Sequence, residues 1–373
     1  MASHILVCPT AFKGTLSARQ AAAALAAGAR NAVGVSAADL VIIPLSDGGN
    51  GLLDAAEHAA GGEVRVARVP GPDGRFVRAR YLVQHHQVVV ETAEACGLHL
   101  LSAARRDPLL TTTAGVGALL LEAAAALPGA HAELVVGLGG SATVDAGAGM
   151  ATALGWSLLD REGEAILPCA SGLLRLDRVV APRLRRLPPR VRVLADVTNP
   201  LLGPAGAARV YGPQKGASAR DVPILERALS RWADVVLRDT GRDARSLEGG
   251  GAAGGLGAAF AVLFGDPPER GASWMLDMVG FDRWLDGARA VVTGEGEWDA
   301  QSSMGKVTGE VVARARAAGV PVLVVAGRLS GRLPKGAVGV GGRRGAEGRL
   351  DARALSLHTR QGLNGLLARR RGP

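Results

Sequence analysis

HILVCPTAFKGTLSARQAAAALAAGAR, residues 4–30, sets the pattern that the rest of the chain follows. Its first five residues form a short apolar run typical of a buried strand, and the alanine-rich run after it is typical of a helix. Ser17 stands where a helix N-cap is expected, and the helix should extend to about Arg30. The stretch therefore predicts a strand, a loop and a helix, which is the repeating unit of a parallel α/β sheet.

The same alternation returns in the next segment and near the C-terminus, but the middle of the chain differs. Further strands are predicted at residues 39–45, 64–69, 76–83, 133–136, 156–160, 191–195, 288–292 and 320–326, and further helices at residues 51–60, 222–238, 252–263 and 306–318. The segments 64–69 and 76–83 flank a Gly-Pro-Asp-Gly turn, which predicts a hairpin. Residues 331–348 are polar and rich in glycine, and we expect them to be mobile.

This order of elements predicts two α/β domains with a cleft between them. The first is a Rossmann-like parallel-sheet domain built from both chain ends, residues 1–62 and 286–373. The second is a mixed α/β domain inserted in the middle, residues 63–285, which carries the hairpin and a glycine-rich loop. Ligands of open α/β sheets bind where the strands end, so the loops that follow the strands are where we look for chemistry.

Composition excludes several classes of protein. Of the 373 residues, 48% are hydrophobic, which allows a large core and excludes a wholly disordered chain. The net charge is +9, but the arginine clusters at 183–186 and 369–371 lack interleaved aromatics, so we expect no nucleic-acid partner. We find no apolar run long enough for a membrane span and no signal peptide. Three cysteines without metal-binding spacing suit a reduced, cytoplasmic protein.

The few lysines are the most informative charged residues. Only four of the 43 basic residues are Lys, namely Lys13, Lys215, Lys306 and Lys335, and each adjoins a glycine. Lysine is a compact point charge that arginine does not replace at a tight site. A lysine beside a glycine turn is one way to place an ammonium group against a phosphate. We therefore single out Lys13 and Lys215.

Five predicted strand ends carry residues suited to phosphoryl transfer. They are Lys13, Asp47, a hydroxyl-bearing glycine loop around Ser141, Asp196 and Asp299. Phosphoryl transfer needs carboxylates for Mg²⁺, a lysine or backbone N–H groups for the phosphates, and a carboxylate to accept a hydroxyl proton. The five loops together predict a phosphotransferase.

Two other functions remain open at this point. Gly137, Gly139 and Ala142 fit the dinucleotide fingerprint G-x-G-x-x-A, with Asp160 at a suitable distance, so an NAD-dependent dehydrogenase is the first alternative. A non-catalytic regulator that binds a nucleotide or a sugar acid is the second. A further glycine-rich run, residues 249–257, would suit either an anion at a helix N-terminus or close helix packing.

Seven motifs occur in an order that identifies a known family. They are AFKGT (11–15), DGGNG (47–51), GLGGSATVDAGAG (137–149), DVTNPLLGP (196–204), GPQKGA (212–217), GAAGGLG (251–257) and TGEGEWDAQS (293–302). With these motifs the chain resembles the glycerate kinase type 1 family, the glycerate 2-kinases, over nearly its full length. The chain departs from the family pattern at Thr10, Asn50 and Val144, where Asp, Glu and Asn are usual.

The resemblance implies a cytosolic enzyme that phosphorylates D-glycerate with ATP and Mg²⁺, usually on the 2-hydroxyl. The residues that we expect to bind substrate or phosphate are Gly139, Gly140, Ser141, Thr143, Lys215 and Asn199. Those that we expect to be catalytic are Asp196, Lys13 and Asp47, and those expected to bind the metal are Asp47 and Asp299. Asp196 is our first choice as base, with Asp145 in reserve, but the sequence allows these carboxylates to exchange roles. Whether the protein forms a homo-oligomer stays open.

Overall fold

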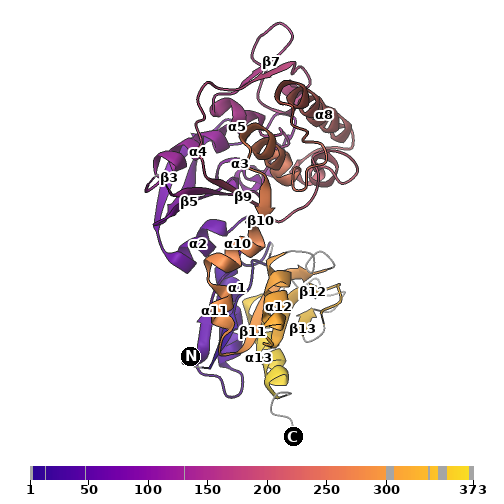
Figure 1. Ribbon diagram of the computed structural model, residues 1–373. Helices are drawn as coiled ribbons and strands as arrows, with labels where there is room; N and C mark the ends of the chain where they lie inside the picture. The colour runs from indigo at the N-terminus through magenta and orange to yellow at the C-terminus, as the bar shows by residue number, and fades with distance from the viewer. Residues whose placement is uncertain are drawn as a thin grey trace. The chain divides into compact units, whose positions relative to one another are not determined.

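The computed structural model describes residues 3–12, 14–46, 48–129, 131–299, 306–334, 337–342 and 351–368. The chain divides into two compact units (Figure 1). The first unit comprises Met1–Asp47, Asp54–Ala60 and Gly271–Pro373, and the second comprises Gly48–Leu53 and Gly61–Arg270. Each unit has its own sheet covered by helices, so the predicted α/β class is confirmed.

The first unit is built on a five-stranded parallel sheet with the strand order β13-β12-β11-β1-β2. Its strands are β1 (His4–Val7), β2 (Leu40–Ile42), β11 (Ala288–Trp298), β12 (Val322–Leu329) and β13 (Ala337–Gly342). β1 pairs directly with β11, so this sheet unites the two ends of the chain. All four residues of β1 are buried, as expected for a parallel strand covered on both faces.

β13 corrects the expectation of mobility for residues 337–342; residues 335–336 and 343–348 of that predicted segment lie outside the described residues. It pairs in parallel with β12, from Val322 opposite Ala337 to Arg328 opposite Gly342. Glycine is depleted in strands, which is why the local sequence gives no strand signal there. The long neighbouring strand β12 supplies the hydrogen-bonding partner, and that information is not local.

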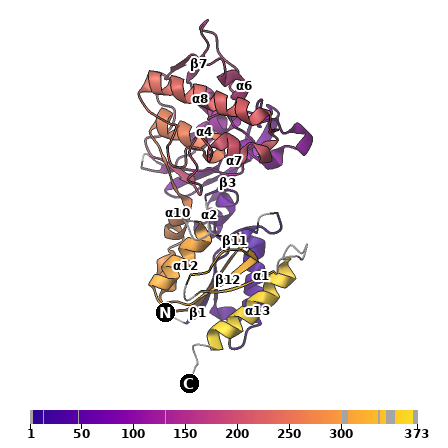
Figure 2. The same ribbon diagram turned by 90° about the vertical axis from the view of Figure 1, so that its right-hand side faces the viewer.

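Helices cover both faces of the first sheet (Figure 2). α1 (Ala18–Arg30) and α13 (Ala352–Ala368) lie side by side on one face, and α12 (Val307–Ala317) lies on the other with α10 (Gly271–Met278) and α11 (Phe281–Leu285). The predicted N-cap of α1 is confirmed: the Ser17 hydroxyl accepts from Gln20 N–H, and the Gln20 side chain accepts from Ser17 N–H at 2.9 Å. This capping box fixes where α1 begins.

The second unit contains a six-stranded mixed sheet with the order β10-β9-β6-β5-β4-β3. Its strands are β3 (Glu63–Pro70), β4 (Phe76–Val83), β5 (Gln87–Glu91), β6 (Glu133–Gly137), β9 (Val191–Ala195) and β10 (Pro268–Arg270). β3 and β4 form the predicted antiparallel hairpin, and β5, β6, β9 and β10 are parallel. The parallel strands therefore end at one edge, where the glycine-rich loop after β6 begins.

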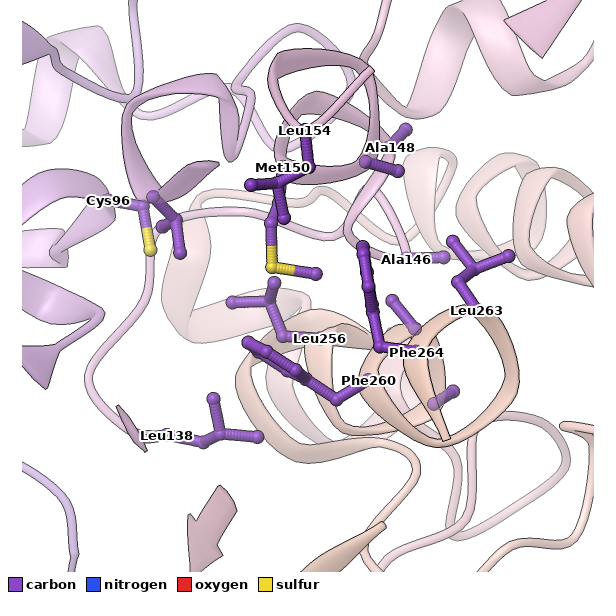
Figure 3. Close-up of a cluster of buried hydrophobic side chains, with 14 of the residues drawn as sticks. Cys96, Leu138, Ala146, Ala148, Met150, Leu154, Leu256, Phe260, Leu263 and Phe264 are labelled. Atoms are coloured by element: carbon purple, nitrogen blue, oxygen red, sulfur yellow. The ribbon is translucent and has the colours of Figure 1, made fainter. Parts of the chain in front are cut away.

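Helices of the second unit pack into a single large core. They are α3 (Ala93–Cys96), α4 (Ala114–Ala125), α5 (Ala148–Ala153), α6 (Ala170–Leu173), α7 (Ala207–Tyr211), α8 (Asp221–Thr240) and α9 (Leu256–Ala259), and α2 (Leu52–Ala60) begins in this unit and ends in the first. Figure 3 shows Met150 of α5 reaching toward Leu256 and Phe260. In the described part of the chain no helix combines the length and apolarity needed to cross a membrane.

The predicted helix at residues 252–263 is confirmed from Leu256 onward, but it is broken at its start. A 3₁₀ turn, Ala252–Gly254, is followed by α9 and then by a π-helical turn, Phe260–Phe264. Gly255 has a φ of +100°, which ends the first turn. A Cβ on Gly254 would overlap the carbonyl oxygen of Thr143. Close backbone packing, rather than an anion at a helix N-terminus, therefore accounts for this glycine run.

At Gly28 the helix α1 packs directly against α13, and replacement of this glycine tests the packing of the first unit. An added Cβ would overlap the carbonyl oxygen of Ser356 and lie 2.7 Å from Thr359 Cβ. We expect Gly28→Ala to lower the free energy of unfolding by about 1–3 kcal/mol, because the two helices must separate.

Gly365→Ala is the matched control on the same helix pair. Gly365 is exposed in α13, and an added Cβ there would have nothing within 4 Å. We therefore expect Gly365→Ala to raise the free energy of unfolding by about 0.5–1 kcal/mol, because alanine has the higher helix propensity. Urea denaturation of both variants measures the difference. Equal stability of the two variants would show that α1 and α13 do not pack as described.

Candidate active site

The glycine-rich loop that follows β6 lies against a second loop of the same unit. A Cβ on Gly137 would overlap the carbonyl oxygen of Gly48, and one on Gly139 would lie 2.7 Å from Gly49 Cα. Gly140 has a φ of +60°, a backbone angle that residues other than glycine rarely adopt. Direct contact between two backbones thus explains the glycines at these positions.

The exposed part of this loop carries backbone donors that the protein does not use. Gly140 is exposed and Gly139 is half-buried. Among the residues that the structure describes, the N–H groups of Gly139, Gly140 and Ser141 donate to no acceptor. Successive N–H groups in a turn of this kind form a concave surface for anions. This stretch of the loop can therefore hold an oxyanion.

Hydrogen bonds with the segment that follows β5 hold the glycine-rich loop in place. The N–H and the hydroxyl of Thr92 both donate to Gly137 O at 3.1 Å. Leu98 N–H donates to Gly140 O at 2.8 Å, and Ala142 N–H donates to Cys96 O at 2.7 Å. The segment after β5 thereby fixes the loop, so its free donors are organised before any ligand arrives.

Lys215 is the buried cation of this site. It ends a 3₁₀ turn, Pro213–Lys215, and only 3% of it is exposed. Its Nζ donates to Ser141 Oγ at 2.9 Å and to the carbonyl oxygen of Thr143 at 2.7 Å. Burial lowers the pKa of Lys215 to about 8, while the nearby Cys96 and Asp145 act in the opposite direction. Near neutral pH the ammonium form thus persists next to the glycine-rich loop.

Asp145 is a fully buried carboxylate with all of its hydrogen bonds inside the protein. It accepts from the N–H and the hydroxyl of Thr113 at 2.9 and 2.7 Å, and from the N–H groups of Gly147 and Gly149, both at 3.2 Å. Burial raises its pKa, and the four donors counteract that rise. Because both oxygens accept hydrogen bonds and the residue is fully buried, Asp145 suits the positioning of the loop and of α5 better than the reserve role of catalytic base.

Two alanines next to this loop have a strained backbone. Ala146 and Ala253 both have a φ of +49°, a region in which alanine is unfavourable. Ala146 N–H donates to the carbonyl oxygen of Gly254 at 3.1 Å, so the two strained turns are hydrogen-bonded to each other. Strain of this kind persists only where the surroundings enforce it, and it concentrates at functional sites.

The Thr143 hydroxyl and the Cys96 thiol share the buried side of the loop. Thr143 is fully buried, and its hydroxyl forms no normal hydrogen bond with any residue that the structure describes. The Cys96 thiol, a weak partner, lies beside it. Burial, aided by Asp145, raises the pKa of Cys96 to about 12, so the cysteine stays a neutral thiol.

A second loop, after β9, brings Asp196, Asn199 and Tyr211 together. The Tyr211 hydroxyl donates to Asn199 Oδ1 at 2.7 Å, and Asn199 Nδ2 donates to the carbonyl oxygen of Ala205 at 2.8 Å. Burial and the nearby Asp196 carboxylate raise the pKa of Tyr211 to about 12. Asn199 is thus oriented by Tyr211 and Ala205.

The first unit carries the other predicted residues. Thr10 follows β1 and donates through its N–H to Gly294 O at 2.9 Å, so the loop after β1 lies against β11. Asp299 follows β11, and its Oδ1 lies 3.9 Å from Lys306 Nζ. Lys13 and Asp47 lie outside the described residues, and their roles stay predictions.

The structure brings only part of the predicted set into contact. Gly139, Gly140, Ser141, Thr143 and Lys215 form one cluster in the second unit. Tyr211 and Cys96 are not among the residues predicted from the sequence. Tyr211 directly precedes the GPQKGA motif and is one of two tyrosines in the chain, a signal that could have marked it. Cys96 gave no local signal, since only folding places it beside Lys215.

The dehydrogenase alternative fails on topology. A dinucleotide fingerprint needs a helix directly after the glycines and a neighbouring parallel strand that ends in the acid. Here α5 begins only at Ala148, and the strand near Asp160 is β7 (Ser157–Leu159), which pairs with β8 (Arg178–Val180) in a separate two-stranded sheet. Asp160 accepts instead from Arg175 at 2.6 Å. The glycines at 137 and 139 therefore serve close loop packing.

Comparison with known proteins identifies the family to which the chain is similar. Residues 5–338 match the sequence profile of the glycerate kinase family. The glycerate kinase of Bacillus subtilis (strain 168) is 39% identical over 332 residues, covering 87% of this chain and 85% of the relative. The glycerate 2-kinase of Escherichia coli (strain K12) is 37% identical over 332 residues, with the same coverage.

A solved structure extends the likeness to the fold. The crystal structure from Salmonella typhimurium LT2 assigned as glycerate kinase 2 matches with a TM-score of 0.78 and 34% identity, covering 99% of this chain and 98% of that one. Fold, loop and relatives together define a kinase. The chain belongs to the glycerate kinase family, which confirms the resemblance seen in its motifs.

Asp145→Asn tests whether this carboxylate holds the loop. An amide nitrogen cannot accept, so at least one of the donors from Thr113, Gly147 and Gly149 is left buried and unpaired. We expect the free energy of unfolding at pH 7 to fall by about 2 kcal/mol or more. Asp243→Asn, at an exposed carboxylate paired with Arg245, is the control and should change stability by under about 1 kcal/mol. Indistinguishable urea midpoints for the two variants would refute the positioning role.

Proposed function

We propose that this protein transfers the terminal phosphoryl group of ATP to D-glycerate, with Mg²⁺ as cofactor and 2-phosphoglycerate as product. The observation that carries the proposal is the run of three unused N–H donors at Gly139, Gly140 and Ser141, with the Lys215 ammonium bonded to Ser141. Several donors and one positive charge at a single loop suit phosphate oxygens. The names of the relatives point to glycerate as the acceptor.

The glycine-rich loop fits the phosphates of a nucleotide in its chemistry. Its donors are backbone N–H groups, and no side chain of Gly139 or Gly140 stands between them and a ligand. The buried Thr143 hydroxyl adds a polar group whose one described contact is the weak one with the Cys96 thiol. We assign to Lys215, and to Lys13 by its sequence motif, the neutralisation of charge on the transferred group or the binding of the glycerate carboxylate.

Asp47 and Asp299 are the residues that we assign to Mg²⁺. Magnesium in nucleotide sites is held by one or two carboxylates together with phosphate oxygens and water. A cluster of three acidic, histidine or cysteine ligands is therefore not required, and the described part of the chain contains none. The Asp299 side chain is 35% exposed, so it is accessible to an ion. When bound, Mg²⁺ would offset the charge of the phosphate oxygens.

Asp196 is the residue that we assign as general base. In the transfer, the acceptor oxygen forms a bond to the terminal phosphorus, the bond from that phosphorus to the oxygen retained by ADP breaks, and the hydroxyl proton passes to Asp196. Tyr211, kept protonated next to Asp196, holds Asn199 in place for substrate. We further propose that the enzyme acts in the cytoplasm on these small molecules alone, since its three cysteines are buried and free.

The proposed function is tested by measuring ADP release from Mg²⁺–ATP with D-glycerate as acceptor. We expect ADP release that depends on glycerate and equals the amount of phosphoglycerate formed, with 2-phosphoglycerate identified by ³¹P NMR. The 3-isomer would correct the assigned position of transfer. Binding of the reactants without ADP release would favour a regulator instead, and would refute a kinase.

Asp196→Asn tests the role of the base. Removing the proton acceptor weakens the transition state and not ground-state binding, so we expect kcat to fall by roughly 10²- to 10⁴-fold with little change in KM. Asp234→Asn is the control, because Asp234 lies on α8 and pairs with Arg245 at the surface; it should keep normal turnover. A kcat for Asp196→Asn within a few-fold of the control would remove Asp196 from the mechanism.

A further inference from the structure

Arg105 and Arg106 are adjacent in sequence but differ in their surroundings. Arg105 pairs with the carboxylate of Asp73. Arg106 is half-buried, and its Nε is buried without a hydrogen-bond partner. Within the described residues its side chain makes no ion pair and donates no hydrogen bond. A guanidinium is always charged and has five donors, so a half-buried one without an acceptor needs an explanation.

The neighbouring acid does not supply the missing acceptor. Asp107 turns back on its own segment, since its Oδ1 accepts from Leu109 N–H at 2.9 Å. Its carbonyl oxygen accepts from Leu110 and Thr111 N–H at 3.1 and 2.9 Å. The local structure is thus complete without Arg106, and neither a helix cap nor a turn employs its side chain.

The backbone places Arg106 beside the lysine of the candidate site. A Cβ on Gly216, the residue after Lys215, would lie 2.6 Å from the carbonyl oxygen of Arg106 and 2.9 Å from its Cβ. Gly216 has a φ of +103°, so a glycine serves both the turn and the contact. The lysine turn therefore packs directly on Arg106.

The same segment is also fastened to the glycine-rich loop. Leu98 N–H donates to the carbonyl oxygen of Gly140 at 2.8 Å, and Gly97 pairs with Ser141 as an isolated bridge. The chain from Gly97 to Arg106 thus contacts both the loop with unused N–H donors and the turn that carries Lys215. Arg106 therefore adds a second cation, after Lys215, near a loop whose unused N–H groups can hold an anion.

We propose that Arg106 is a further binding residue of this site, whose guanidinium donates to an oxyanion of the reactants. The proposal rests on the proposed function, which supplies two such groups: the carboxylate of glycerate and a phosphate of the nucleotide. Both present paired oxygens to which a planar guanidinium can donate two parallel hydrogen bonds. Lysine cannot reproduce that geometry, so charge alone is not enough at this position.

The test compares Arg106→Gln and Arg106→Lys with Arg105→Gln, a matched control that removes an equal charge one residue away. KM for D-glycerate and for ATP is measured separately, and so is the shift in thermal midpoint that each reactant produces. We expect both Arg106 variants to raise KM for one reactant by roughly 10- to 100-fold and to lose protection by that reactant. The control should change neither quantity.

The arms of the experiment separate the two sources of the oxyanion. A loss confined to D-glycerate assigns Arg106 to the carboxylate, and a loss confined to ATP assigns it to a phosphate. Without ligands, Arg106→Gln should keep or raise the thermal midpoint, because a cation without an acceptor is removed. A lowered midpoint with normal KM values would show a structural role and overturn the proposal.

Failure of this inference is distinct from failure of the proposed function. If wild type and Arg105→Gln turn over D-glycerate and the Arg106 variants match them in KM and in protection, only the inference is wrong. If wild type itself releases no ADP with D-glycerate, the proposed function is wrong, and with it the inference that rests on that function.

Discussion

The second unit is organised around a lysine ammonium buried against a glycine-rich loop. Removing a cation from water is costly, and Lys215 offsets that cost with hydrogen bonds to Ser141 and Thr143 and with the charge of Asp145. The loop brings a hydroxyl and a carbonyl oxygen to one point, and it is held there by close backbone contacts with Gly48 and Gly49 and by the bond from Ala146 N–H to Gly254 O.

The fold supplies the setting for this contact by ending parallel strands at one edge. β5, β6 and β9 are neighbours in one sheet, so Thr92, the glycine-rich loop and Asp196 all follow strands at that edge. Thr92 and Leu98 then bind the loop's carbonyl groups and leave its N–H groups for a ligand. Organised dipoles of this kind need little rearrangement when charge develops on a transferred group.

Signals that act over a few residues were readable from the sequence. The N-cap at Ser17, the hairpin around residues 71–74 and the apolar strand runs are local, and they yielded the α/β class. The broken segment at 252–263 and the strand β13 depend on distant partners, and so does the burial of Asp145. The motifs indicated Ser141 and Lys215 separately, but only the folded chain shows that they are hydrogen-bonded.

The pKa of Lys215 is the quantity that tests this account most directly. In protein labelled with ¹³C-lysine, the Cε resonance of Lys215 can be assigned with Lys215→Arg and followed by NMR as the pH is raised. We expect a midpoint near 8, below the ordinary lysine value of 10.5, because burial disfavours the charged form. A midpoint at or above 10 would mean that the ammonium is exposed to water, and would contradict the buried contact with the loop.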